Sequence, residues 1–141
     1  MSGPLLDRID IALEIPAVRE RDLARQAASL FRTETEAARR RIGTARAAQA
    51  ERARAHGVGA LNARLTAAEF ACAAPLAPAL QARLFHAIEV LGLSARGVHR
   101  TWRLARTLAD LTGEPRVGPA AIDEALTMCW RGPAPATAPR G

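Results

Sequence analysis

The sequence predicts a mainly α-helical fold that is preceded by a single β-strand. Aromatic residues make up only 4% of the 141 residues, and alanine is abundant. Such a composition suits closely packed helices and offers little material for sheets. Capping residues and apolar positions at helical spacing then recur along the chain after residue 33.

The opening stretch is the exception, because it has the pattern of a β-strand. Over Ile9–Ile15, apolar residues occupy the odd positions, and acidic residues or alanine occupy the even ones. A single strand leaves its N–H and C=O groups unpaired. We therefore expect it to pair with a sheet that this chain does not contain. The charged, mixed segment 17–33 predicts a linker.

The first helix is predicted from residue 34 to about Ala55. Thr33 and Glu36 have the spacing of a capping box, and His56 with Gly57 ends the pattern. The polar side of this helix and its borders carry Arg39, Arg46, Gln49 and Arg52. We expect a solvated face there, with contact to DNA or to a neighbouring subunit as the alternative.

Shorter helices are predicted between residues 66 and 91 and again after Pro119. Thr66 and Glu69 form a second predicted capping box, for a helix over Ala67–Ala73, and an apolar stripe predicts another over about residues 77–91. Pro119 suits the first position of the last helix. The inner face of that last helix is expected to carry Ile122, Ala125, Leu126 and Cys129. Residues 132–141 predict a disordered tail.

The most informative helix is predicted between Ser94, a good N-cap, and Gly113, a good C-terminal stop. The face predicted to be buried carries Val98, Thr101, Trp102, Ala105, Leu108 and Ala109.

Three arginines fall on the opposite side of this helix. Arg96, Arg100 and Arg103 are spaced by four and then three residues, which places them in a row beside the helix start. The helix dipole disfavours a cation in the first turn by roughly 0.3–1 kcal/mol. Arg96, together with the free N–H groups of that turn, could therefore hold a phosphate oxygen. Spacing alone favours the alternative that all three arginines are solvated.

All 20 basic residues are arginines, and the net charge is +6. A P-loop requires a lysine that reaches the β and γ phosphates of the nucleotide, and this chain has none. We therefore expect the chain by itself not to be an enzyme.

Several other classes of site are also disfavoured. No interleaving of aromatic and basic residues or zinc-finger spacing is found, so the charge supports at most weak, nonspecific DNA contact. Cys72 and Cys129 stand apart, which fits a reducing cytosol, and the isolated His56, His86 and His99 predict no metal site. Without an apolar run of membrane length or a signal peptide, we expect a cytoplasmic protein.

Three segments resemble the magnesium-chelatase-like AAA+ ATPases of the ComM/YifB type. GLSARGVHRTWRLARTLADLTG looks like the last helix of that family, in which a similar Ser-Ala-Arg segment carries the sensor-2 arginine. SGPLLDRIDIALEIP resembles the end of its ATPase core. RIGTARAAQAERARAHG, followed by Asn62, resembles its helix with arginine, glutamine and asparagine. The resemblance covers nearly the whole chain to about Arg131.

This resemblance implies the C-terminal portion of a longer, ring-forming ATPase that processes DNA and is linked to natural transformation. Residues 1–16 would be the remnant of the AAA+ core, with its arginine-finger motif and last strand. Residues 17–33 would be the linker and 34–131 the helical lid, a magnesium-chelatase C-terminal-like domain, before the tail at 132–141.

The same resemblance implies roles for particular residues. Arg8, in Leu-Leu-Asp-Arg, would act in trans on the nucleotide of a neighbouring subunit, as a permanent bidentate cation can. Arg96 would sense nucleotide in cis, with Arg100 and Arg103 as supporting candidates. ATP and Mg²⁺ are implied only with a complete AAA+ core. The implied partners are that core or neighbouring subunits, with DNA as a further candidate and no membrane. An Asp7–Arg8 pair that caps local structure is the alternative for Arg8.

Two other interpretations stay open. A stand-alone helical module could bind nucleic acid or an acidic protein surface through its arginines, although an unpaired strand argues against such a module. A truncated gene product, or a mis-assigned start at Met1, is compatible with the family resemblance. The chelatase motor subunit of pigment synthesis fits less well.

Overall fold

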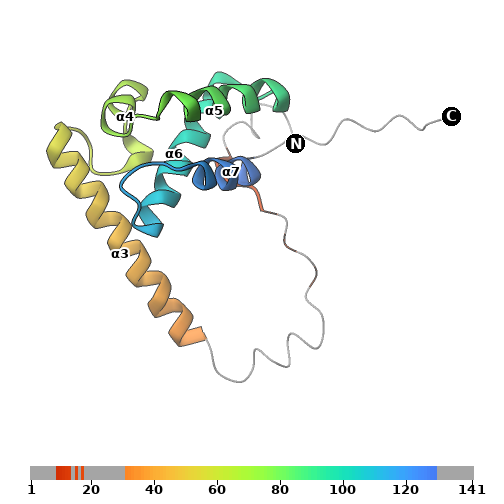
Figure 1. The fold of residues 1–141 in the computed structure, drawn as a ribbon. Helices are drawn as coiled ribbons and strands as arrows, with labels where there is room; N and C mark the ends of the chain where they lie inside the picture. The colour runs from red at the N-terminus through yellow and green to blue at the C-terminus, as the bar shows by residue number, and fades with distance from the viewer. Residues whose placement is uncertain (1–8, 14, 16, 18–30, 130–141) are drawn as a thin grey trace.

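Helix α6 (Ala95–Thr112) is the element on which the other helices pack. The computed structural model describes residues 9–13, 15, 17 and 31–129, and α6 runs through the middle of them (Figure 1). The remaining elements are α3 (Phe31–His56), the 3₁₀ helix η1 (Asn62–Arg64), α4 (Ala67–Ala73), α5 (Pro78–Leu91) and α7 (Pro119–Met128). All of these except α4 make substantial contacts with α6, and α4 packs on α3. The prediction of a mainly helical fold is confirmed.

Both predicted ends of α6 are confirmed. The Ser94 side chain accepts a hydrogen bond from the Gly97 N–H at 3.2 Å, as an N-cap does. Gly113 has a φ of 75° and donates its N–H back to the last turn. That left-handed conformation strains any residue with a Cβ, so glycine suits this position.

Two apolar clusters meet at α6. The larger contains the buried Leu84, Ala105 and Ile122, from three different helices, and the smaller surrounds Phe70. Trp102 packs against both clusters, contacts the Phe70 ring edge-on at 5.1 Å between centroids, and donates its indole N–H to the Ala74 carbonyl. Trp102 thus joins the two clusters without leaving its N–H unpaired.

The predicted buried face of α6 is largely confirmed. Thr101, Ala105 and Ala109 are fully buried, whereas Val98, Trp102 and Leu108 are partly buried. The predicted inner face of α7 is buried at each of its four positions.

The shorter helices also follow their predicted signals. The Thr66–Glu69 capping box is present, α4 has the predicted bounds, and Pro119 begins α7. The predicted capping box at Thr33 is wrong, because α3 already includes that residue. Helical geometry extends farther toward the N-terminus than the capping signal indicated.

The predicted strand over Ile9–Ile15 is not confirmed. Residues 9–13, 15 and 17 contain no strand, and Ile11, Leu13 and Ile15 are exposed. The Ala12 N–H donates to the carbonyl of Met128 at the end of α7, at 2.8 Å. Since the described residues hold no other strand, this segment has nothing to form a ladder with.

A buried carboxylate joins α3, η1 and α6. Asp110 is 1% exposed and forms ion pairs with Arg52 of α3 and with Arg106, which lies one turn earlier in α6. Asn62 donates to Asp110 Oδ2 at 2.9 Å and to Thr107 Oγ1 at 3.2 Å, and it accepts from Arg52 at 3.0 Å. We call these five residues the Asp110 network. A buried charge requires such partners, so the network restricts how α3, η1 and α6 can pack.

The expected solvated face of α3 is therefore only partly present. Arg39 and Arg46 are exposed, but Gln49 is 7% exposed and Arg52 reaches Asp110. The first half of α3 extends away from the other helices (Figure 1), and its described side chains over 34–44 are exposed except for the half-buried Ala37.

The remaining sequence predictions for the two ends fall outside the described residues. Arg8, most of the segment 17–30 and the tail at 132–141 belong to this group. Among the described helices, none combines the length and apolar character that a membrane crossing requires.

We predict that Asp110→Asn lowers the free energy of unfolding by about 3–5 kcal/mol, because Arg52 and Arg106 would lose their buried counter-charge. Asp123→Asn is the matched control. Asp123 pairs with Arg83 at 2.7 Å, but both side chains are half exposed, so that change should cost less than about 1 kcal/mol. Urea unfolding followed by circular dichroism measures both. Equal losses would contradict a dominant role for the buried network.

We also predict a pH-dependent contribution from the α4 cap. The backbone N–H of Thr66, and secondarily its hydroxyl, donate to Glu69 and lower the pKa of this carboxyl below its ordinary value of 4.5. A lowered folded pKa stabilises the fold above the unfolded pKa, and this is lost as pH falls through the folded value. The Tm advantage of the parent over Glu69→Gln should therefore shrink as pH falls below 4.5. An advantage that is constant over pH would contradict it.

Candidate functional site

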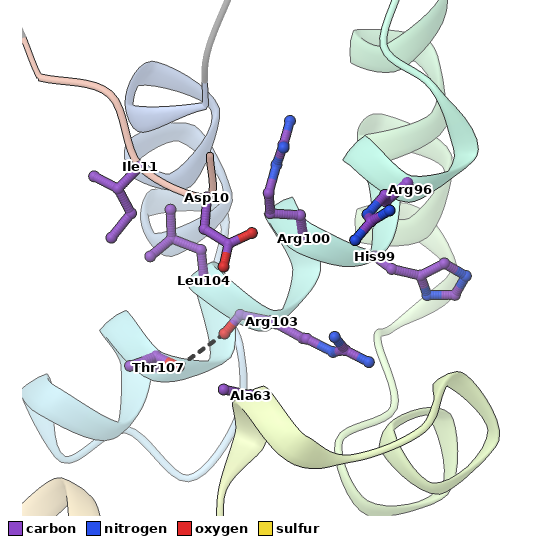
Figure 2. A pocket seen from close by; sticks show the side chains of 9 residues that line it. All are labelled: Asp10, Ile11, Ala63, Arg96, His99, Arg100, Arg103, Leu104 and Thr107. Carbon is purple, nitrogen blue, oxygen red and sulfur yellow. Dashed lines mark hydrogen bonds between the residues drawn. The ribbon is translucent and has the colours of Figure 1, made fainter. Parts of the chain in front are cut away.

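The three arginines of the α6 start line one hollow with a volume of about 460 Å³ (Figure 2). Its walls are formed by Arg96, His99, Arg100, Arg103, Leu104 and Thr107 of α6, Ala63 of η1, and Asp10 and Ile11 of the N-terminal segment. The hollow thus brings together the three residues that the sequence placed in a row. Asp10 is the single carboxylate among the described residues that line the hollow, and in Figure 2 it points toward α6.

The expectation that all three arginines lie on a solvated side of α6 is wrong for two of them. Arg100 is only 8% exposed and Arg103 is half-buried, whereas Arg96 is exposed. The reason is that η1 packs on this side of α6 and that Asp10 lines the same hollow. The helix is therefore covered on more than its apolar face.

Arg103 is held in place by its surroundings. Its guanidinium donates to the Leu65 carbonyl and lies 6.0 Å from the centre of the Phe70 ring, a cation–π distance. Its Nε is buried and has no hydrogen-bond partner among the described residues. Buried N–H groups are nearly always paired, and this unpaired donor belongs to a side chain that lines the hollow.

Arg96 has a different character. It is exposed in the first turn of α6, next to the Ser94 cap, and it lines the hollow. The dipole of α6 disfavours a cation at this position, and an anion bound in the hollow would relieve that cost.

His99 and the cysteines do not form a metal-binding group in the described part of the chain. His99 stacks on Trp102, with 6.4 Å between ring centres. Cys72 is exposed and Cys129 is buried beside the Thr101 hydroxyl. No three His, Cys, Asp or Glu side chains within the described ranges lie close enough to hold a metal ion.

Taken chemically, the hollow is suited to an oxyanion. Guanidinium groups carry a permanent charge and bind phosphate oxygens in a bidentate manner. One wall offers a guanidinium at Arg103 that is held by its neighbours, and the rim offers an exposed one at Arg96.

The sequence analysis did not identify the buried ion pair between Arg106 and Asp110 in the second half of α6. Arg106 and Asp110 have the i, i+4 spacing of an ion pair, which was the available signal. That spacing could not show that the pair is buried, because burial depends on α3 and on the loop carbonyls of Glu114 and Pro115 to which Arg106 donates.

We predict that Arg103 and Arg96 differ in their effect on stability. Arg103→Ala should lower the free energy of unfolding by about 1–3 kcal/mol, because the Leu65 carbonyl loses its donor and Phe70 its cation. Arg96→Ala should change it by less than about 0.5 kcal/mol, because Arg96 is exposed. Urea unfolding followed by tryptophan fluorescence checks both. A large loss with Arg96→Ala would show that this residue supports the fold.

Comparison with known proteins gives a family. The model of the family described as magnesium chelatase, subunit ChlI C-terminal, matches residues 32–128, which include all of the helices except the first residue of α3. No solved structure matches the chain significantly.

Similar curated proteins indicate the same family. The competence protein ComM of Haemophilus influenzae is 35% identical over 127 residues, which are 89% of this chain and 23% of that protein. Uncharacterized proteins of Mycobacterium tuberculosis and Mycobacterium bovis are each 35% identical over 138 residues, 93% of this chain and 25% of theirs. The chain spans about a quarter of the length of these curated relatives. It belongs to the magnesium chelatase C-terminal family and is similar to ComM.

Proposed function

We propose that this chain is the helical lid module of a ComM-like AAA+ ATPase and that Arg96 contacts a phosphate of the bound nucleotide. One observation carries the proposal: a single hollow gathers Arg96, Arg100 and Arg103. A phosphate in that hollow would offset their positive charge.

The two arginines would divide the work. Arg103, held by the Leu65 carbonyl and the Phe70 ring, would provide a fixed donor. Arg96 is exposed and can move onto a phosphate that an adjoining ATPase core presents. Since the chain lacks lysine and hence a P-loop, Mg-ATP would be held mainly by that core, and the chain alone would not hydrolyse it.

The position of the hollow on α6 supports a coupling role. The start of α6 lines the hollow, and the end of α6 carries Asp110, which is tied to α3 and η1. A movement of α6 caused by phosphate binding in the hollow would therefore be transmitted to the helices packed on α6. Rigid-body movement of this kind is a common way to convert nucleotide state into work.

Arg8 is proposed, on the family resemblance, to act in trans on the nucleotide of a neighbouring subunit. It lies outside the described residues, so its support is the Leu-Leu-Asp-Arg motif and the need for a permanent cation at a subunit edge.

A second candidate function is nonspecific DNA binding by α3. The projecting half of this helix exposes Arg39, Arg40 and Arg41 in succession. Such a cluster can neutralise phosphates of the DNA backbone, with an affinity that falls steeply with salt. This role is compatible with a DNA-processing ATPase ring.

The test of the main proposal is ATP turnover by this chain mixed with a separately expressed family core that bears a P-loop. Arg96→Ala should lower turnover of the mixture roughly 10- to 100-fold, since a charged hydrogen bond contributes about 1.5–3 kcal/mol. Arg54→Ala is the control, because Arg54 is exposed and does not line the hollow that Arg96 lines. Arg8→Ala tests the proposed trans contact in the same assay.

Two outcomes would contradict the nucleotide role. The first is full turnover with Arg96→Ala. The second is a chain that never associates with the core but retards DNA, with retardation lost at higher salt and in a variant in which Arg39, Arg40 and Arg41 are changed to Gln. That second result would favour the binding module.

A further inference from the structure

A second hollow lies elsewhere in the molecule and shares no lining residue with the first. Its volume is about 470 Å³, within the usual range for small-molecule sites. It is formed where the end of α3, the turn after α4, the middle of α6 and the α6–α7 loop meet. The lining residues are Arg52, His56, Cys72–Ala77, Arg106 and Pro115–Val117.

The charge of this second hollow is strongly one-sided. Arg52, Arg106 and Arg116 line it, and none of the described residues in its wall is a carboxylate. The buried Asp110 behind the wall is shared by Arg52 and Arg106, so it balances one of those two charges. Glu114 adds a negative charge near Arg106, but it is exposed.

The pKa of the Arg106 guanidinium is lowered mainly by burial. Asp110 raises this pKa, and the positive charge of Arg52 lowers it by less than Asp110 raises it.

The basic groups differ in what they have left to offer. Arg106 donates to Asp110 and to the carbonyls of Glu114 and Pro115, so each of its three nitrogens already has an acceptor. Arg52 likewise donates to Asn62 and Asp110 through both terminal nitrogens. Arg116 is exposed, and within the described ranges it has no ion pair or hydrogen bond through its side chain. It is therefore the guanidinium that can bind a ligand directly, in the field of the other two.

The rest of the wall is apolar. Ala73, Ala74 and Val117 are buried, Leu76 is half-buried, and Pro75 lies between them in sequence. A ligand that fits both parts carries a negative group at one end and an apolar body at the other.

We propose that this hollow, which we call the Arg116 site, binds a small organic anion. A carboxylate or phosphate group would meet Arg116 and His56 at the rim, in the positive field of Arg52 and Arg106, and the apolar body would lie against Ala74, Leu76 and Val117. The Arg116 site is separate from the Arg96 hollow and does not depend on nucleotide binding there.

Cys72 makes this site measurable. It lines the hollow and is exposed, whereas Cys129, the other cysteine of the chain, is buried. The probe is 5,5′-dithiobis(2-nitrobenzoate), an aromatic disulfide with two carboxylates. The Cys72 thiolate attacks one sulfur of the probe, a mixed disulfide forms, and thionitrobenzoate leaves and is measured by its absorbance. The uncharged comparison reagent is 2,2′-dithiodipyridine.

The measured quantity is the rate of Cys72 with the anionic reagent divided by its rate with the uncharged one. The same ratio for a small neutral thiol serves as the reference. At low salt we expect the ratio for Cys72 to exceed the reference by roughly tenfold, because the positive field concentrates the anion, and we expect it to fall with added salt. Cys72→Ser should abolish the reaction.

Matched variants distinguish the effect of the Arg116 site from the effect of the net charge of the chain. Arg116→Gln should remove about threefold or more of the preference. Arg54→Gln removes the same charge from an exposed position that does not line the hollow, and it should leave the preference nearly unchanged. Both positions are exposed, and circular dichroism of each variant verifies the fold.

Competition identifies the anionic group. Benzoate should slow the reaction of Cys72 if the site accepts a carboxylate, and phenyl phosphate should slow it if the site accepts a phosphate. Protection by benzoate, or by phenyl phosphate beyond that given by inorganic phosphate, supports the proposal. Equal protection by inorganic phosphate and phenyl phosphate would overturn it, because the apolar wall would then play no part. A ratio equal to the reference, equal effects of Arg116→Gln and Arg54→Gln, or no protection by either aromatic anion would overturn it.

Discussion

The structure depends on one buried carboxylate that is shared by two arginines. Asp110 cannot stay charged inside the protein without partners, and its partners come from α3, η1 and its own helix. Both α3 and η1 must therefore contact α6 at a particular place along the length of α6. The apolar clusters around Ile122 and Phe70 supply burial without strict direction, so the directional bonds of the Asp110 network select one arrangement among those that bury similar area.

Four arginines of the described residues show two different roles. Arg52 and Arg106 spend their donors on protein oxygens, so they shape the fold and contribute charge to their surroundings. Arg96 and Arg116 are exposed and have donors available for a ligand. A count of arginines, or a net charge of +6, does not distinguish these groups, because the distinction is made by burial.

The relation between the two hollows also follows from α6. Arg96 and Arg103 line one hollow, and Arg106 lines the other, so a single helix borders both. Trp102 packs between apolar clusters from several elements and is anchored through Ala74. The proposed movement of these helices as a unit requires this kind of continuous packing, since loosely joined helices would absorb a displacement locally.

Local sequence signals account for several helix ends and inner faces of this protein. Ser94, Gly113, Thr66 with Glu69, and Pro119 act through bonds or dihedral preferences within a few residues, and apolar spacing defined the inner faces of α6 and α7. The family motifs were likewise readable as short segments. Only the tertiary structure decided which polar residues are buried. Arg52, Asn62 and Asp110 are separated in sequence but bonded to one another. Arg100 is buried, against the expectation of a solvated side chain, because other segments cover that side of α6. Burial of a charge is settled by what packs against it, and no local pattern contains that information.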